Sequence, residues 1–172
     1  MRKYIRNYVP GGAYFLTQVT HQRIPYFKSD ETNHELLQII KRVQTSKQFE
    51  LLAYCFIPDH VHLLIQLPPG DSDFSYRMRE IKRLTTIYIR KKSSNPDLKV
   101  WQDRFWEHTI RDETDLRIHF DYIHYNPVKH GVAESFDGWK WSSYRDYYGS
   151  GYDKKNELNS AVFVDSKINF GE

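Results

Sequence analysis

Two histidines separated by a single residue could begin a metal site. His60 and His62 flank Val61 within a run of apolar and β-branched residues that predicts a strand. Successive side chains of a strand point to opposite faces, so the two imidazoles would project together while Val61 faces the other way. Neutral imidazole is a common metal ligand. Such a pair alone is more often structural, because a complete site needs a third ligand from elsewhere in the chain.

A second candidate lies in a predicted helix, where Tyr122 and Asn126 are four residues apart and therefore share a face. The Asn126 amide oxygen could bind a hard divalent cation, with the Tyr122 hydroxyl about one turn away. A phenol, with a pKa of about 10, is a weak nucleophile until it is activated, and a divalent metal can neutralise a phosphate under attack. Together the two elements predict transfer of a phosphate to Tyr122. Taken alone, the tyrosine is more simply explained as the edge of a helical core face.

Basic and aromatic side chains suggest contacts with nucleic acid. The net charge of +3 does not by itself demand a polyanionic partner, but residues 77–92 carry seven basic side chains against the single acid Glu80. Such a helix could neutralise phosphates, and tryptophans beside arginines could stack unpaired bases. A solvated helix face and core packing are the alternatives. The candidate DNA contacts are Arg79, Lys82, Arg83, Trp101, Arg104, Trp106, Arg111 and Lys129.

Four further histidines could supply a third nitrogen ligand, although each is individually more often a structural or surface residue. His119 precedes Tyr122 by three residues and would lie on a similar face of the helix, near the candidate site. The four are His108, His119, His124 and His130.

The order of the predicted elements indicates how these side chains are positioned. The third of the predicted helices is expected to end near Tyr125, because Pro127 disfavours helical backbone at Asn126. Strands are expected over 13–20, 49–57 and 60–67, with a short one inside 100–110; helices are expected over 31–47, from a cap at Ser72 or Ser75 to about 92, from a cap at Asp112 or Thr114 to about 125, and within 139–148.

The sequence strand–helix–strand–strand–helix–strand predicts an α+β fold. The simplest arrangement is a ferredoxin-like sandwich, in which helices cover one face of an antiparallel sheet, with extra helices at the C-terminal end. A chain of 172 residues predicts a single domain, which we assign to residues 1–148. Residues 149–172 are polar and irregular in composition, so they are expected to form a loosely held tail.

Composition bounds the cellular context. Cys55 is the only cysteine, so no intramolecular disulfide can form. No stretch approaches the roughly 20 apolar residues that a membrane span needs, and residues 1–20 contain no continuous apolar core of a secretion signal. These features predict a cytoplasmic protein without membrane association.

Several motifs follow one another in a fixed order from about Tyr4 to Tyr144, and as an ordered set they are highly specific. With them the sequence resembles the REP-associated tyrosine transposases. These belong to the single-tyrosine branch of the HUH endonucleases, named for two histidines that flank a hydrophobic residue. The motifs are GGAYFLT (11–17), PDHVH (58–62), DFS (73–75), REIK (79–82), WQ (101–102), RFWEH (104–108), IR (110–111), DYIHYNPVKHG (121–131), Trp139 and WSS (141–143).

The resemblance implies a role for each candidate. His60 and His62 match metal ligands, Asn126 matches the third ligand, where relatives outside this branch use glutamine, and Tyr122 matches the nucleophile. The implied metal is Mg²⁺ or Mn²⁺. The implied substrate is a single-stranded hairpin from a repetitive extragenic palindrome (REP), with a guide tetranucleotide at its foot, cleaved and rejoined through a 5′-phosphotyrosine. Such an enzyme would act in the bacterial cytoplasm, associated with the nucleoid through DNA. A monomer is favoured, although dimers with shared sites occur in the wider superfamily.

Alternatives from other classes remain open on the sequence. A mononuclear metal-dependent hydrolase would hold Zn²⁺ with His60, His62 and a distal histidine, and would use water as the nucleophile. A non-catalytic module would bind palindromic hairpins on a ferredoxin-like sheet whether or not a metal is present. A domesticated transposase would keep its catalytic residues and bind palindromes without moving them.

Overall fold

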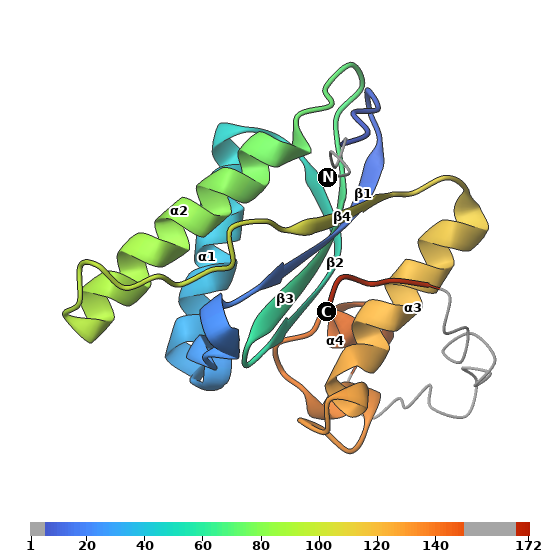
Figure 1. Cartoon of the computed structure of the whole chain (residues 1–172). Helices are drawn as coiled ribbons and strands as arrows, with labels where there is room; N and C mark the ends of the chain where they lie inside the picture. Colours follow the sequence, from blue (N-terminus) through green and yellow to red (C-terminus); the bar gives the residue numbers. More distant parts are fainter. Residues whose placement is uncertain (1–5, 150–167) are drawn as a thin grey trace.

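A four-stranded antiparallel sheet organises the chain, which a computed structural model describes over residues 6–149 and 168–172 (Figure 1). Neighbouring strands lie in the order β2-β3-β1-β4, and each pair is antiparallel. Along the chain the core elements follow the order β1-α1-β2-β3-α2-β4, so the ferredoxin-like α+β fold predicted from the sequence is confirmed. The strands are β1 (Ala13–Val19), β2 (Glu50–Ile57), β3 (His60–Gln66) and β4 (Trp106–Thr109).

Two long helices, α1 (Asp30–Ser46) and α2 (Phe74–Ser93), cover one face of the sheet (Figure 1). Leu63 of β3 packs there in one buried cluster with Ile40 and Ile81, and each of the three is at most 2% exposed. The connections add the short 3₁₀ turns η1 (His21–Arg23), η2 (Tyr26–Lys28) and η3 (Phe136–Gly138).

The opposite face of the sheet is covered by α3 (Glu113–Lys129) and the short α4 (Tyr144–Tyr148) (Figure 1). Phe15 and Leu64, which point away from α1 and α2, form a second buried cluster with Ile123 of α3. The extra C-terminal helices expected from the sequence therefore close the face that the ferredoxin-like helices leave open. Site residues on this face lie between the sheet and α3.

Side chains of aspartate begin α2 and α3. Asp73 caps α2 by accepting a hydrogen bond from the backbone of Tyr76 at 2.9 Å, so the caps predicted at Ser72 or Ser75 were wrong. Asp112 caps α3 by accepting from Asp115 at 2.9 Å, which selects one of the two predicted residues.

Pro127 does not end α3, contrary to the prediction from the sequence, and the helix continues to Lys129. A proline this close to a helix end removes only one backbone donor. The helical turn that follows is closed by the backbone of His130, which donates to the Asn126 carbonyl at 3.0 Å. The buried side chain of Asn126 is held opposite His60, and this contact favours helical backbone where the local preference opposes it.

A buried ion pair joins the start of α2 to the β3–α2 connection, and it gives a test of the fold. Arg77 is 1% exposed and donates to Asp71 at 2.8 Å, which lowers the pKa of that carboxyl to about 2. Asp71→Asn should destabilise the protein by about 3 kcal/mol, because it leaves a buried guanidinium without its counter-charge. Urea unfolding would measure the loss, with the exposed Asp97→Asn as a control expected to stay within about 0.5 kcal/mol.

The pH dependence of the same pair has a defined sign. The pKa of Asp71 is lower in the folded chain than its ordinary value of 3.8, so the pair stabilises the protein above about pH 4, and this contribution is lost as the pH falls towards 2. The difference in stability between wild type and Asp71→Asn should therefore shrink over that window. A difference that stays constant from pH 6 to about pH 2 would contradict this assignment.

No helix within residues 6–149 and 168–172 is long and apolar enough to cross a membrane.

Candidate active site

The two motif histidines lie on the face of β3 that α3 covers, and both are fully buried. Tyr122 and Asn126 project from α3 towards them, as their spacing predicted. His60 Nε2 is 3.2 Å from Asn126 Oδ1, and the rings of His62 and Tyr122 meet edge to face with their centroids 5.6 Å apart. The four residues proposed from the sequence therefore meet within one chain.

Hydrogen bonding determines which ring nitrogen of His60 carries the proton. Its Nδ1 is 2.7 Å from the carboxylate of Asp59. Burial opposes ionisation of Asp59, but contacts with His60 and Arg23 lower the pKa of this carboxyl. The carboxylate can only accept, so the imidazole proton lies on Nδ1. Burial lowers the pKa of His60, which favours the neutral ring. Its Nε2 lone pair then faces the amide oxygen of Asn126.

The same analysis applies to His62, whose Nδ1 is 2.8 Å from the hydroxyl of Thr17. Thr17 donates its own proton to the carbonyl of Phe170 at 2.6 Å, so it accepts from Nδ1–H of His62. Burial lowers the pKa of His62 to about 4, so the ring is neutral at pH 7. The Nε2 atom of His62 also points into the site, where it lies 3.0 Å from the Glu172 carboxylate.

These atoms form a set that fits a divalent cation. The Asn126 amide nitrogen donates to Glu172 at 2.8 Å, which orients the amide oxygen towards His60. His60 Nε2, His62 Nε2 and the amide oxygen of Asn126 thus converge, and together they form a mixed nitrogen and oxygen donor set of the kind that holds a divalent cation. Each imidazole donates its other N–H to a fixed oxygen, as metal-bound histidines do.

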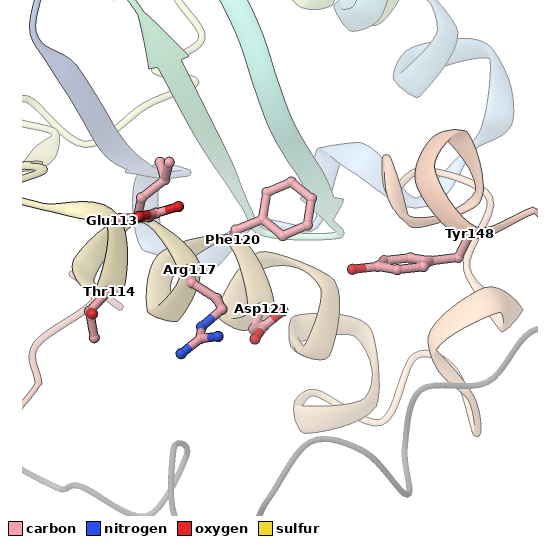
Figure 2. A pocket seen from close by; sticks show the side chains of 7 residues that line it. Glu113, Thr114, Arg117, Phe120, Asp121 and Tyr148 are labelled. Atoms are coloured by element: carbon pink, nitrogen blue, oxygen red, sulfur yellow. The ribbon is translucent and has the colours of Figure 1, made fainter.

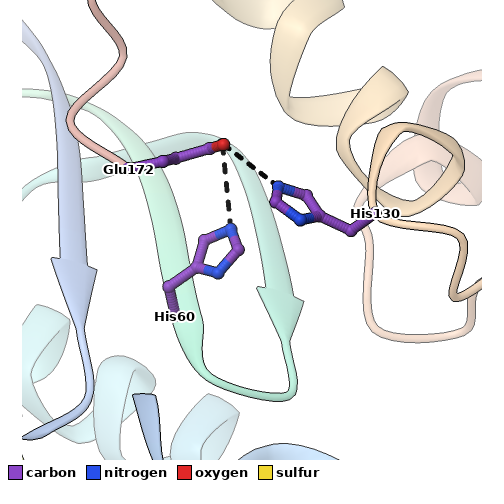
Figure 3. Close-up of side chains that lie close together, drawn as sticks. All are labelled: His60, His130 and Glu172. Carbon is purple, nitrogen blue, oxygen red and sulfur yellow. Dashed lines mark hydrogen bonds and ion pairs between the residues drawn. The ribbon is translucent and has the colours of Figure 1, made fainter. Parts of the chain in front are cut away.

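The C-terminal segment (residues 168–172) enters this site between the sheet and α3 (Figure 1). The carboxylate of Glu172 is 3.0 Å from His62 Nε2 and 3.0 Å from His130 Nε2. It also accepts from the Tyr122 hydroxyl and from Lys129. Figure 3 shows the carboxylate between the rings of His60 and His130. Burial opposes ionisation of Glu172, but its contacts, led by those with His130 and His62, hold the pKa of Glu172 well below its usual range.

An aromatic contact adds to this arrangement. The ring of Phe170 stacks on the ring of Tyr122 with centroids 3.5 Å apart and planes within 4° of parallel. The sequence predicted an irregular, loosely held tail from residue 149. Residues 150–167 lie outside the described chain, whereas residues 168–172 have no helix or strand and contact the candidate nucleophile directly. Sequence reasoning gave this segment no place in the site.

The environment of Tyr122 opposes ionisation of its hydroxyl. The residue is 3% exposed, and burial together with the negative charge of Glu172 raises the pKa of the phenol well above its usual range. One cation offsets this effect: Lys129 Nζ is 2.6 Å from the Tyr122 oxygen.

The four further candidate histidines lie in different places, some in the site and others in the surrounding structure. Only His130 joins the candidate metal ligands among them, with its ring centroid 4.7 Å from that of His60. His124 is buried with Nε2 2.9 Å from the hydroxyl of Ser143.

His108 and His119 stack on each other beside Asp115, with ring centroids 4.4 Å apart. Asp115 there already accepts from the backbone and side chain of Arg111, each at 3.0 Å. The Arg111 cation next to this carboxylate makes the group a poor metal site.

The candidate DNA contacts occupy different environments. Trp101 is 5% exposed, stacks on Phe27 and donates to the Lys82 carbonyl at 3.2 Å, so its ring belongs to the core and not to a base-stacking surface. Lys82 donates to the carbonyls of Gln102 and Asp103, which fixes a loop. The other candidates are all exposed or half-buried. They are Arg79, Arg83, Arg104, Trp106, Arg111 and Lys129.

A hollow of about 580 Å³ lies on the outer side of α3, lined by Arg117, Phe120, Tyr148 and their neighbours (Figure 2). None of the candidate metal ligands lines it, and neither does Tyr122. The candidate nucleophile and metal ligands therefore lie on the inner side of α3, away from this hollow.

Comparison with known proteins defines the class to which this fold and site belong. Residues 9–126, which include all four candidate residues, match the family model described as Transposase IS200 like. A REP-associated tyrosine transposase of Escherichia coli strain K12 is 39% identical over 145 residues, which is 84% of this chain and 83% of that protein. A Haemophilus influenzae relative, provisionally named as the same kind of protein, is 39% identical over 152 residues, covering 84% and 86% of the two chains.

A solved structure agrees with the sequence relatives. The structure described as a REP-associated tyrosine transposase bound to a REP hairpin superposes with a TM-score of 0.82 at 34% identity, covering 100% of this chain and 98% of that one. The chain therefore belongs to the REP-associated tyrosine transposases. This family implies a divalent metal, and the lone pairs of His60, His62 and Asn126 fit one.

Sequence reasoning missed three members of the site, namely Thr17, Phe170 and Glu172. Thr17 lies opposite His62 in the β1–β3 register, so it could have been found only once that pairing was known. Phe170 and Glu172 are separated from Tyr122 by about fifty residues, and nothing in their local sequence indicates where they lie.

Proposed function

We propose that this chain cleaves and rejoins single-stranded DNA at REP-type hairpins through a 5′-phosphotyrosine on Tyr122. The observation that carries the proposal is that the Tyr122 hydroxyl, His60 Nε2, His62 Nε2 and the Asn126 amide all surround one carboxylate oxygen of Glu172. A nucleophile for phosphate and a set of ligands for a divalent cation thus lie together, buried between β3 and α3. The relative solved with a REP hairpin supports the choice of substrate.

His60, His62 and Asn126 would hold the cation, which we take to be Mg²⁺ or Mn²⁺. Once bound, it would neutralise charge on the scissile phosphate and stabilise the transition state. The mixed nitrogen and oxygen donor set suits Mn²⁺ in particular, because imidazole is a softer ligand than Mg²⁺ usually takes.

The covalent step exchanges one phosphodiester for another. The Tyr122 oxygen bonds to phosphorus, the bond from phosphorus to the 3′ oxygen breaks, and the departing strand ends as a 3′ hydroxyl. One proton moves overall from the phenol to that hydroxyl. Because the bond energy is kept, attack by a 3′ hydroxyl on the phosphotyrosine rejoins strands without ATP.

The remaining basic candidates would orient the DNA. Arg79 and Arg83 on α2 and Arg104 beside Trp106 are available for phosphates or unpaired bases. Arg111 and Lys129 lie at the two ends of α3. The nucleophile and the ligands come from the same chain, which supports action as a monomer. With DNA as its substrate, the enzyme would work at the bacterial nucleoid in the cytoplasm.

The experiment is intact-protein mass spectrometry after incubation of the full chain with REP-type hairpin oligonucleotides and Mn²⁺. The expected result is an added mass equal to the strand 3′ of the cut, together with a released 3′ hydroxyl fragment on a denaturing gel. Cutting without any protein adduct would favour the water-using hydrolase. Binding without cutting, across varied flanking sequences and with either metal, would favour a non-catalytic hairpin-binding module.

A further inference from the structure

Lys129, the last residue of α3, reaches back to the candidate nucleophile. It follows Tyr122 by seven residues, so two helical turns bring it to the same face of the helix. Helical side chains lean towards the N-terminus, and the Lys129 ammonium lies 2.6 Å from the Tyr122 oxygen and 4.8 Å from the centre of its ring. The helical geometry of α3 therefore places the Lys129 ammonium beside the Tyr122 oxygen.

The phenol needs such a partner because of where it lies. Tyr122 is 3% exposed with Phe170 stacked on its ring, and a DNA strand that replaces the C-terminal segment would likewise keep water from the oxygen on which negative charge develops during attack. A fixed cation at hydrogen-bond distance from that oxygen stabilises the charge strongly in a buried site. Lys129 itself is partly open, with 38% of its side chain exposed, so the ammonium keeps its own contact with water.

We propose that Lys129 is a catalytic residue whose ammonium stabilises the phenolate of Tyr122, both when Tyr122 attacks DNA and when it leaves during rejoining. The inference rests on the proposed function. In cleavage, the phenolic proton passes to water, the bond from the Tyr122 oxygen to phosphorus forms, the bond to the 3′ oxygen breaks, and that oxygen takes a proton from water. Lys129 stays protonated throughout.

Two simpler roles for Lys129 make different predictions. A contact with the DNA backbone alone would weaken binding and leave the rate at saturating DNA unchanged. A role in holding the C-terminal segment, through its ion pair with Glu172, would make loss of Lys129 speed cleavage. Each variant is therefore also made together with Glu172→Ala, so that the ion pair is absent from both proteins in a comparison.

The first experiment measures single-turnover cleavage of a REP-type hairpin at saturating DNA, with DNA affinity determined separately in EDTA. Lys129→Met removes the charge and keeps the length, whereas Lys129→Arg keeps the charge. We expect Lys129→Met to lower the rate about 100-fold with affinity within about threefold, and Lys129→Arg to recover much of the loss. Lys140→Met, a surface lysine that pairs with Asp30, should match wild type.

A second experiment separates the attacking oxygen from the leaving one. In a hairpin with sulfur in place of the scissile 3′ oxygen, the departing thiolate needs no proton. The Lys129→Met defect should persist on this substrate and should appear equally in rejoining from a preformed adduct. A defect that disappears with the sulfur substrate would mean that Lys129 serves the leaving strand, and a wild-type rate for Lys129→Met would likewise overturn the proposal. Absence of an adduct in wild type would instead overturn the proposed function.

Discussion

Replacing Tyr122 with phenylalanine is expected to abolish the protein–DNA adduct and to lower cleavage by about 10,000-fold or more, because the variant has no atom that can form the bond to phosphorus. The substitution removes only the hydroxyl. The ring remains to pack on Phe15 and against His62, so the fold and the metal ligands should be kept. Mass spectrometry with hairpin DNA and Mn²⁺ measures the adduct, and a denaturing gel measures the cleavage.

Tyr125→Phe is the matched control, because Tyr125 lies on the same helix and its ring packs against Phe136, with the ring centroids 6.0 Å apart. It should form the adduct at a rate close to wild type. Hairpin affinity should be the same for both variants. Cleavage that continues in Tyr122→Phe at a wild-type rate would contradict the tyrosine mechanism and would return the water-using hydrolase to consideration.

Removing residues 168–172 is expected to speed cleavage about 10-fold or more. In the structure, the Glu172 carboxylate accepts hydrogen bonds from the Tyr122 hydroxyl and the Asn126 amide, and Phe170 stacks on the ring of the nucleophile. A scissile phosphate cannot reach Tyr122 while this carboxylate lies beside it. Single-turnover cleavage of a hairpin by the full chain, the shortened chain and the double variant Phe170→Ala, Glu172→Ala would measure the effect.

Asn169→Ala serves as the control for this prediction, since Asn169 is exposed and its side chain accepts a hydrogen bond from the backbone of Gly171 in the same segment at 2.8 Å. It should change the rate much less than loss of Phe170 and Glu172. A slower reaction after removal of the segment would contradict the prediction, and it would indicate that Glu172 completes the metal site rather than blocking it.

Much of the fold could be predicted because the local patterns and the packing agree. The alternation of β3 separates His60 and His62 from Val61, and the structure keeps that separation, with the histidines under α3 and Val61 in the core beneath α1 and α2. The prediction that α3 ends before Pro127 was wrong because local preference and packing disagree there. Local backbone preference argued against helix at Asn126, and a buried contact from another part of the chain outweighed it.

The site was predictable only where its residues share a strand or a helix. Spacing placed the two histidines on one face of β3 and Tyr122 beside Asn126 on α3, and the resemblance to a family joined the two elements. Thr17 reaches the site through its pairing with His62 in the β1–β3 register, and Glu172 reaches it from fifty residues beyond Tyr122. Neither is encoded by local spacing, so no pattern in the sequence could have named them.

The C-terminal segment also sets a threshold for the DNA that the enzyme will accept. Because Glu172 belongs to the same chain as the site that it fills, its local concentration is fixed by the tether and does not fall on dilution. Part of the binding free energy of any DNA is therefore used to displace the segment. The apparent affinity for DNA is lowered in proportion to the fraction of protein molecules whose site the segment has left. A hairpin that also engaged the exposed arginines of α2, Arg79 and Arg83, would displace the segment more readily than a weakly held single strand would. Discrimination between substrates would then come from the competition for the site as well as from contacts with the bases.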